Sequence, residues 1–188
     1  MNVSKRFRSI PAVAILLLMA GAVFAQDGAP SKSAAEVVTP HVYVSLDRVP
    51  RSKPFQIALV IDIAENYHMN SHKPLDSFLI PTILTPTLPP GFKLVDTIYP
   101  PGHQKKFPFS PDKPLDVYSG SATLRLKLIA DSTAALGSTT IPMTLRYQAC
   151  NMNACLPPVK ISATAQFEMI KAGASSHPAH ADIFAAKE

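Results

Sequence analysis

Two cysteines, Cys150 and Cys155, are the residues of this 188-residue chain best suited to covalent chemistry. They stand in the run LRYQACNMNACLPPV, where one alternating stretch leads into Cys150 and another begins after Cys155. Alternation on both sides of a short polar turn is typical of a β-hairpin, so the two thiols should meet at its tip. They can form one disulfide or one redox pair, but they are too few for a four-thiolate zinc site.

The spacing favours a redox pair over a purely structural bridge. Loop entropy gives about 2 kcal/mol for a ring of roughly six residues, less than half the value for a ring of about a hundred. A bridge across a turn that the hairpin already closes therefore adds little stability, and short rings are more readily reduced. Strand parity also indicates that one sulfur is more shielded than the other. The alternative is a β-sandwich binding or chaperone-like module with a structural disulfide.

A third interpretation is a Cu(I) site in which Met69, Met152 and His68 join the two cysteines as ligands. It is the least favoured, because methionine in strands usually belongs to the core and isolated histidine is usually solvated. No helix is expected after Cys155, so no helix dipole would lower the pKa of its thiol. We expect no cofactor and no resident metal.

The first 25 residues have the features of a secretory signal peptide. A basic start that contains Lys5, Arg6 and Arg8 precedes an apolar run over residues 12–24, which is short for a membrane span. Cleavage is expected near Ala25. The mature chain would then lie outside the cytoplasm, in a compartment that permits disulfides.

Removal of the leader changes the charge of the chain. The formal net charge of +5 falls to +2, because three of the 18 basic residues and none of the 13 acidic residues lie in the leader. The mature chain has no basic stripe with interleaved aromatics, so we expect no nucleic-acid partner. It also lacks a nucleotide-binding loop, a Ser-His-Asp set and paired carboxylates, so no small-molecule substrate is expected.

Composition and periodicity predict an all-β fold. The apolar content of 47% with 16% charged residues excludes a disordered chain, and 19 prolines disfavour long helices. Strand-like alternation occurs at residues 42–46, 55–63, 122–129, 141–149 and 159–169. About seven strands in this length favour an immunoglobulin-like β-sandwich. We expect this domain at residues 40–171, after a linker at residues 26–39 and before a flexible tail at residues 172–188.

Residues 99–116 interrupt the strand pattern with five prolines and two phenylalanines, Phe107 and Phe109. A long loop inside a compact domain is more often functional than filler. Two phenylalanines on a proline-stiffened loop need an apolar surface to cover. The loop is therefore either a cap over a site or a surface segment that plugs a gap in the sandwich.

The cysteine motif resembles the N-terminal periplasmic, immunoglobulin-like domain of the thiol:disulfide interchange protein DsbD family. The matching residues are YQAC at 147–150 and CLPP at 155–158. Weaker similarity continues upstream through NYHMN at 66–70, LPPG at 88–91 and the stretch from Asp96 to Tyr99. The resemblance spans residues 40–169.

The resemblance implies a domain that relays reducing equivalents from a membrane electron-carrier protein, through a thioredoxin-like donor, to thioredoxin-like periplasmic acceptors. Such chemistry is of the protein-disulfide reductase type and serves redox homeostasis and cytochrome maturation. The second cysteine, Cys155, would form the mixed disulfide with partners, and Cys150 would resolve it. A cap loop at residues 99–109 would shield the pair.

The same resemblance implies a cap and pocket built from a small set of residues: Asp96, Tyr99, Phe107, Phe109, His68 and Asn70. The sequence departs from the family at three places. The insert between the cysteines is short, with four residues. Ile98 stands where relatives have a cap aromatic, a role that Phe107 or Phe109 could take, and His68 and Asn70 lie in a stretch that is aromatic elsewhere. The membrane portion and the terminal thioredoxin-like domain of the family have no counterpart in these residues, which leaves the electron donor open.

Overall fold

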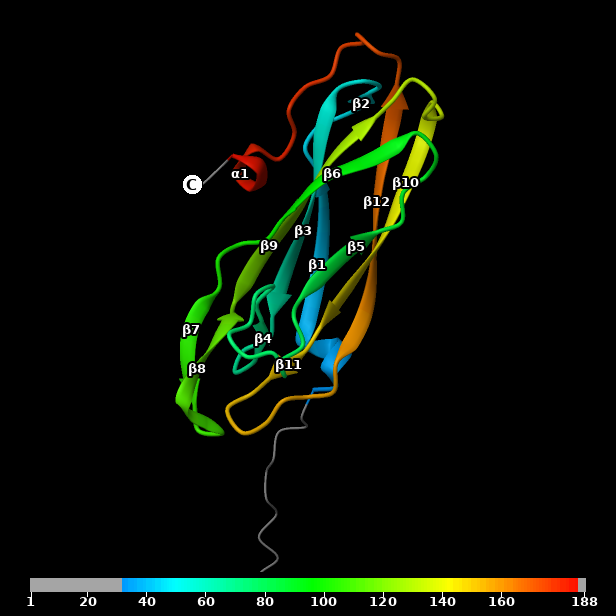
Figure 1. Cartoon of the computed structure of the whole chain (residues 1–188). Helices are drawn as coiled ribbons and strands as arrows, with labels where there is room; N and C mark the ends of the chain where they lie inside the picture. The colour runs from blue at the N-terminus through cyan, green and yellow to red at the C-terminus, as the bar shows by residue number, and fades with distance from the viewer. Residues whose placement is uncertain (1–31, 186–188) are drawn as a thin grey trace, which may run out of the picture. The chain divides into compact units, whose positions relative to one another are not determined.

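The computed structural model describes residues 32–185, so the predicted signal peptide and residues 26–31 of the predicted linker lie outside the described residues. Nearly all regular structure is β-strand (Figure 1). One large sheet has the order β1-β3-β9-β6, formed by Val38–Val44, Pro54–Ile63, Ser121–Ala130 and Phe92–Ile98. The other has the order β2-β12-β10-β5, formed by Val49–Pro50, Val159–Ile170, Gly137–Tyr147 and Ile83–Pro86.

The two large sheets enclose one hydrophobic core, which confirms the predicted all-β, immunoglobulin-like sandwich. Alternation along β3 and β9 sends every second side chain inward: the odd-numbered apolar residues of β3 and the even-numbered ones of β9 are buried. β10 contributes its own buried row, which ends at Tyr147. Each of the five stretches that alternation predicted contains a strand, although β1 ends at Val44 and the stretch 141–149 is interrupted at Gln148.

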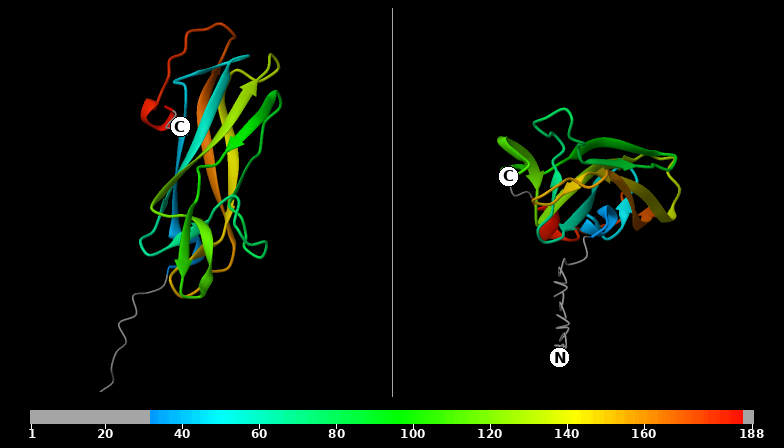
Figure 2. Two further views of the ribbon diagram at one scale, coloured as in Figure 1. Left: turned by 60° about the vertical axis from the view of Figure 1, so that its left-hand side comes forward. Right: turned by 90° about the horizontal axis from the view of Figure 1, so that it is seen from below.

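A third, smaller sheet closes one end of the sandwich, at the bottom of Figure 1. Its order is β11-β4-β8-β7, formed by Ala149–Cys150, His68–Asn70, Ser110–Tyr118 and His103–Phe107. Three side chains of the β7–β8 hairpin, Phe107, Leu115 and Val117, form a separate small core. The cysteine hairpin therefore ends in a sheet of its own at the tip of the domain (Figure 2).

The proline-rich segment is a β-hairpin and not the long loop that the sequence predicted. β7 and β8 pair from His103 opposite Val117 to Lys105 opposite Leu115, and the register then shifts before Phe107 meets Ser110. Pro111 and Pro114 fall within that shift. Because a proline nitrogen has no hydrogen to donate, prolines fit where the ladder is already interrupted.

Both ends of the described chain are more ordered than their composition suggested. Within the predicted linker, Ala34–Val37 forms a 3₁₀ helix and Val38 begins β1, and the Val37 side chain is buried. The predicted tail runs back along β1, where Pro178 bridges to Leu46 and a short helix, α1, spans Ala181–Phe184. No helix in residues 32–185 has the length and apolarity needed to cross a membrane.

Gly91, in the LPPG turn, allows a test of the packing at this turn. Its φ of +82° disfavours any side chain, and a Cβ there would lie 2.5 Å from the Ala134 nitrogen and 2.7 Å from its Cα. Gly120 has a similar φ of +70° with no atom within 4 Å of a Cβ, so it reports the backbone cost alone. We expect Gly120→Ala to lower the free energy of unfolding by about 1 kcal/mol.

Gly91→Ala should cost about 1–3 kcal/mol more than the control, because the backbone of Ala134 must move. Urea unfolding of both variants measures the difference. Equal losses at the two glycines would show that the contact between the turn and Ala134 does not constrain this end of the sandwich.

Candidate active site at the cysteine hairpin

Cys150 and Cys155 form a disulfide bond at the tip of the β10–β12 hairpin, with their Cα atoms 3.9 Å apart. The turn between them is held by Asn151, whose Oδ1 accepts hydrogen bonds from the backbone N–H groups of Asn153 and Ala154 at 2.9 and 3.0 Å. Such an Asx turn reverses the chain without glycine. The predicted position of the pair is therefore confirmed, and the short insert is stabilised by its own side chain.

The two sulfurs differ in exposure. Cys150 is fully buried, whereas Cys155 is partly exposed, next to an exposed turn in which Met152 retains 42% of its accessible surface. Parity places Cys150 on the face opposite the main core, where its neighbour on β4 is His68, a buried residue covered by the Phe107 ring. A reagent from solution therefore reaches Cys155 more easily than Cys150.

His68 lies directly opposite Cys150, because the two residues are register partners in the antiparallel pairing of β4 with β11. Opposed residues in such a pair point to the same face, with Cβ atoms typically about 4.5–5.5 Å apart. The imidazole is 2% exposed and stacks on Phe107 at 3.9 Å between ring centroids. Phe109 in turn stacks on Phe107 at 5.3 Å between ring centroids and is 40% exposed.

The electrostatic surroundings keep His68 neutral. Burial is the main cause that lowers its pKa from 6.5 to about 4, and the positive charge of Lys105 and the nearby His103 lower it further. The Lys105 ammonium lies 5.4 Å from the centroid of the Phe107 ring that covers the imidazole. Nε2 of His68 is buried and has no hydrogen-bond partner among the described residues.

A pair of amides connects the cysteine hairpin to residues 71–82. The buried Asn70 donates from Nδ2 to the carbonyl of Ile80 at 3.1 Å and to Oε1 of Gln148 at 3.2 Å. Gln148 in turn donates from Nε2 to the carbonyl of Leu156, beside Cys155, at 3.3 Å. Sequence reasoning did not select Gln148 as a site residue, although it belongs to the YQAC motif that carried the resemblance.

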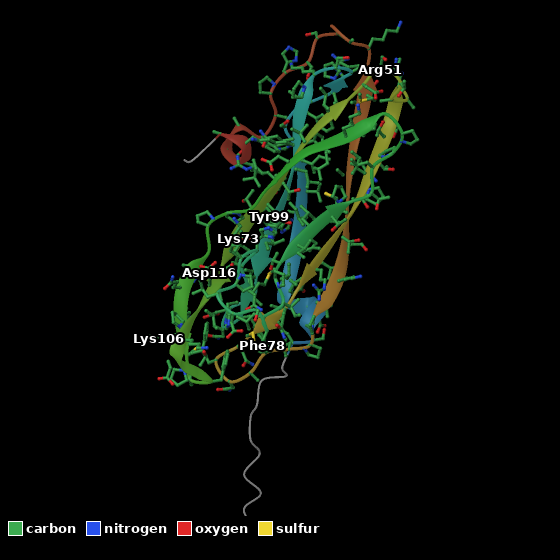
Figure 3. All side chains as sticks on the ribbon, viewed as in Figure 1. Arg51, Lys73, Phe78, Tyr99, Lys106 and Asp116 are labelled. Carbon is green, nitrogen blue, oxygen red and sulfur yellow. A yellow bond between two sulfur atoms is a disulfide. The ribbon has the colours of Figure 1, made fainter. Side chains whose placement is uncertain are left out.

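Two of the predicted site residues lie apart from the aromatic stack. Asp96 is in β6 and contacts the Lys127 ammonium at 3.9 Å, whereas Tyr99 stacks on His72 with ring centroids 3.7 Å apart. Both line an open hollow of about 480 Å³ that also involves Asp116. Figure 3 shows Tyr99 and Asp116 above the tip of the β7–β8 hairpin. The structure thus brings together His68, Phe107 and Phe109 and separates them from Asp96 and Tyr99.

The suggested copper ligands are not arranged as a thiolate site. Both sulfurs of Cys150 and Cys155 are in the disulfide bond. Met69 is buried in the main core, and Met152 is exposed in the turn. A Cu(I) site of this composition would need free thiolates.

The lowered pKa of His68 predicts a pH dependence of stability. Its folded-state pKa of about 4 lies below the unfolded value of about 6.5, so the unfolded chain binds more protons between these pH values. The free energy of unfolding should therefore fall as the pH drops through this window, and the loss is complete below pH ~4. At pH 4.5 the expected loss is about 2–3 kcal/mol.

The variant His68→Phe keeps the aromatic stack and removes the titration. Urea unfolding of both proteins at pH 7 and pH 4.5 isolates the contribution of His68, because the other titrating groups are common to both. We expect the wild type to lose more stability than the variant. Identical losses would mean that His68 is not held neutral in the folded state.

The chain was compared with curated protein sequences and with solved structures. No curated protein sequence matches the chain. Among solved structures, the reduced N-terminal domain of DsbD from Neisseria meningitidis has 15% identity and a TM-score of 0.44, with 78% of this chain and 94% of that chain covered. The N-terminal periplasmic domain of ScsB from Proteus mirabilis has 12% identity and a TM-score of 0.45, with 69% of this chain and 46% of that chain covered.

The assignment rests on a family model, described as the N-terminal part of the thiol:disulfide interchange protein DsbD, that matches residues 34–166. This range contains both cysteines, the β7–β8 hairpin and all three sheets apart from the last four residues of β12, and it confirms the resemblance drawn from the sequence. The chain therefore belongs to the DsbD N-terminal family and contains a thiol:disulfide interchange domain with a cysteine pair.

Proposed function

We propose that this chain is an exported, periplasmic domain that relays reducing equivalents through Cys150 and Cys155, from a thioredoxin-like donor served by a membrane electron carrier to thioredoxin-like acceptors. The observation that carries the proposal is the asymmetric disulfide: Cys155 is reachable from solution and Cys150 is buried beside it. Family membership supports thiol exchange as the chemistry.

In this proposal Cys155 is the attacked and attacking sulfur, and Cys150 is the resolving thiol. A donor thiolate attacks the Cys155 sulfur, the bond to Cys150 breaks, and Cys150 leaves as a thiolate that takes up a proton. The second thiol of the donor then attacks the donor sulfur of the mixed disulfide and releases Cys155. The donor is oxidised by two electrons, and the domain is left with two thiols.

The reduced domain passes these electrons on in the reverse order. The Cys155 thiolate attacks an acceptor disulfide, and Cys150 resolves the mixed disulfide, which restores the bond between the two cysteines. The backbone β-bridge between Cys150 and Cys155 and the hydrogen bond from the Gln148 amide to Leu156 hold the two ends of the insert together. The resolving thiol therefore stays close to the mixed disulfide. This proximity supports rapid release of the acceptor.

We further propose that the β7–β8 hairpin serves as the cap, with Phe107 as its main shielding residue. The stack of Phe107 on His68 covers the residue opposite Cys150, and Phe109 extends the stack toward solvent. Burial of one sulfur limits attack by unrelated thiols. Asp96 and Tyr99 would contribute to the cap from the neighbouring hollow. Asn70 would contribute through the hydrogen bonds of its side-chain amide.

The reduction potential separates this function from a structural disulfide. Structural disulfides of secreted proteins have potentials below about −300 mV. We expect the Cys150–Cys155 pair to lie above this value and to equilibrate with a reduced thioredoxin-like protein, as measured by redox titration of the mature chain. A potential below that limit together with no exchange would instead support the binding module with a structural disulfide.

Single cysteine variants test the roles of the two thiols. Cys150→Ser removes the resolving thiol, so a mixed disulfide with a thioredoxin-like partner should persist and run as one adduct on a non-reducing gel. The matched variant Cys155→Ser should leave only the buried thiol and trap little or no adduct. If Cys155→Ser traps the partner and Cys150→Ser does not, the two roles are inverted.

A further inference from the structure

His68 is a buried polar residue at the cysteine end of the domain that thiol exchange by two cysteines does not by itself explain. Polar side chains that are buried normally have hydrogen-bond partners, and leaving one unpaired destabilises the fold. Nε2 of His68 is buried without a partner among the described residues of the oxidised structure. The His68 residue is only 2% exposed, and Phe107 stacks on its ring, so solvent does not replace the missing partner. A solvated surface or a simple apolar filler would not require this nitrogen.

The residue opposite His68 is Cys150, whose sulfur gains a proton whenever the disulfide is reduced. A thiol is a donor and a neutral imidazole nitrogen is an acceptor, so reduction creates a partner for the unpaired nitrogen. The two side chains share one face of the β4–β11 pair, within the reach that opposed residues have. The pairing that positions Cys150 therefore also positions His68.

We propose that His68 is the proton acceptor for the Cys150 thiol when Cys150 resolves a mixed disulfide at Cys155. This inference rests on the proposed function. The proton moves from the Cys150 sulfur to His68, and the thiolate attacks the Cys155 sulfur. The Cys150–Cys155 bond forms, the bond from Cys155 to the partner breaks, and the partner leaves as a thiolate that takes the proton from the imidazolium.

The buried position of Cys150 explains the need for such a group. Burial disfavours a thiolate, and only the thiolate attacks a disulfide. Cys150 is fully buried, so water is a poor proton acceptor for its thiol. Transfer to an adjacent base avoids the ionisation of an isolated buried thiol, a contribution that is typically about 10²–10⁴-fold in rate.

The charged neighbours keep the acceptor available. On β7, Lys105 and His103 oppose a positive charge on His68, and β11 contributes Cys150 itself. β8 carries Tyr118 opposite Met69, and Asp116 lies two positions earlier in the same strand. The imidazole is therefore neutral at periplasmic pH, and only the thiolate that forms opposite it raises its pKa enough to hold the proton, which then passes readily to the leaving thiolate.

The experiment follows one mixed disulfide in the reduced mature chain. Glutathione disulfide is added in excess, samples are quenched in acid, and mass spectrometry counts the glutathione adduct over time. The rise of the adduct reports attack by Cys155, and its decay reports resolution by Cys150. His68→Phe keeps the aromatic stack without a nitrogen, and His68→Gln keeps a hydrogen-bond acceptor that cannot take a proton.

Both variants should lengthen the lifetime of the adduct by about tenfold or more at pH 7 and leave its rate of formation within about twofold of wild type. The control His41→Gln changes an exposed histidine of β1 and should match wild type. Between pH 5.5 and 8 the decay should depend weakly on pH in the wild type. In the variants it should rise by nearly tenfold per unit, because the thiol must ionise to solvent.

Wild-type lifetime and pH slope in His68→Phe would overturn the inference and leave the proposed function intact. Equal slowing of formation and decay would also overturn it, since that result indicates a general distortion of the hairpin. If the wild-type chain neither forms nor resolves an adduct, the proposed function fails, and this role of His68 fails with it.

Discussion

The antiparallel pairing of β11 with β4 is the interaction on which the cysteine end of the domain depends. The long ladder between β10 and β12 stops at Tyr147 opposite Val159, before the cysteines are reached. Beyond that point the hairpin would be an isolated two-stranded ribbon, which has little stability in water. β4 provides the third strand and β8 the fourth, so the disulfide is held by a sheet instead of by its own bond alone.

The same pairing determines the unequal burial of the two sulfurs. β4 pairs with β11, which contains Cys150 and precedes the turn. Within residues 32–185, Cys155 forms a β-bridge with Cys150 but has no strand paired on its other side. Hydrogen bonds of the Asn70 and Gln148 side-chain amides then hold residues 71–82 against the cysteine hairpin. The loop they anchor carries Phe78, which is 91% exposed at the end of the domain that holds the hairpin (Figure 3). One backbone contact thus fixes the buried thiol, the exposed thiol and the surface around them.

Local periodicity predicted the long strands because each of them has one buried face. The odd-numbered residues of β3 and the even-numbered residues of β9 show this directly, and the cysteine tip followed from the strands on either side. β4 was not predictable in this way, since all three of its residues are buried and no alternation remains. The β7–β8 hairpin was hidden for another reason: its prolines disfavour a strand, and only the register shift shows how they are accommodated.

Parity along β10 and β11 also illustrates where local reasoning ends. It correctly separated Cys150 from the inward row that ends at Tyr147, but it could not show that β11 joins a third sheet, in which His68 lies beside Cys150 on the outer face. Gln148 was overlooked on the same ground, because a glutamine on a polar face looks solvated until Asn70 and Leu156 are placed beside it. The site depends on contacts between segments far apart in the sequence, and these contacts have no local signal.

Selective thiol exchange places two opposing demands on this site. An exposed pair would react with any thiol, whereas a fully buried pair would react with none, and burial of one thiol also suppresses the thiolate that resolution needs. The structure divides these demands between two residues: Cys155 is accessible, and Cys150 is protected by β4 and the aromatic stack. Protection of Cys150 then requires a proton acceptor inside the protected region. An uncharged imidazole opposite that sulfur meets this requirement, because it introduces no charge into the apolar surroundings until the thiol supplies the proton.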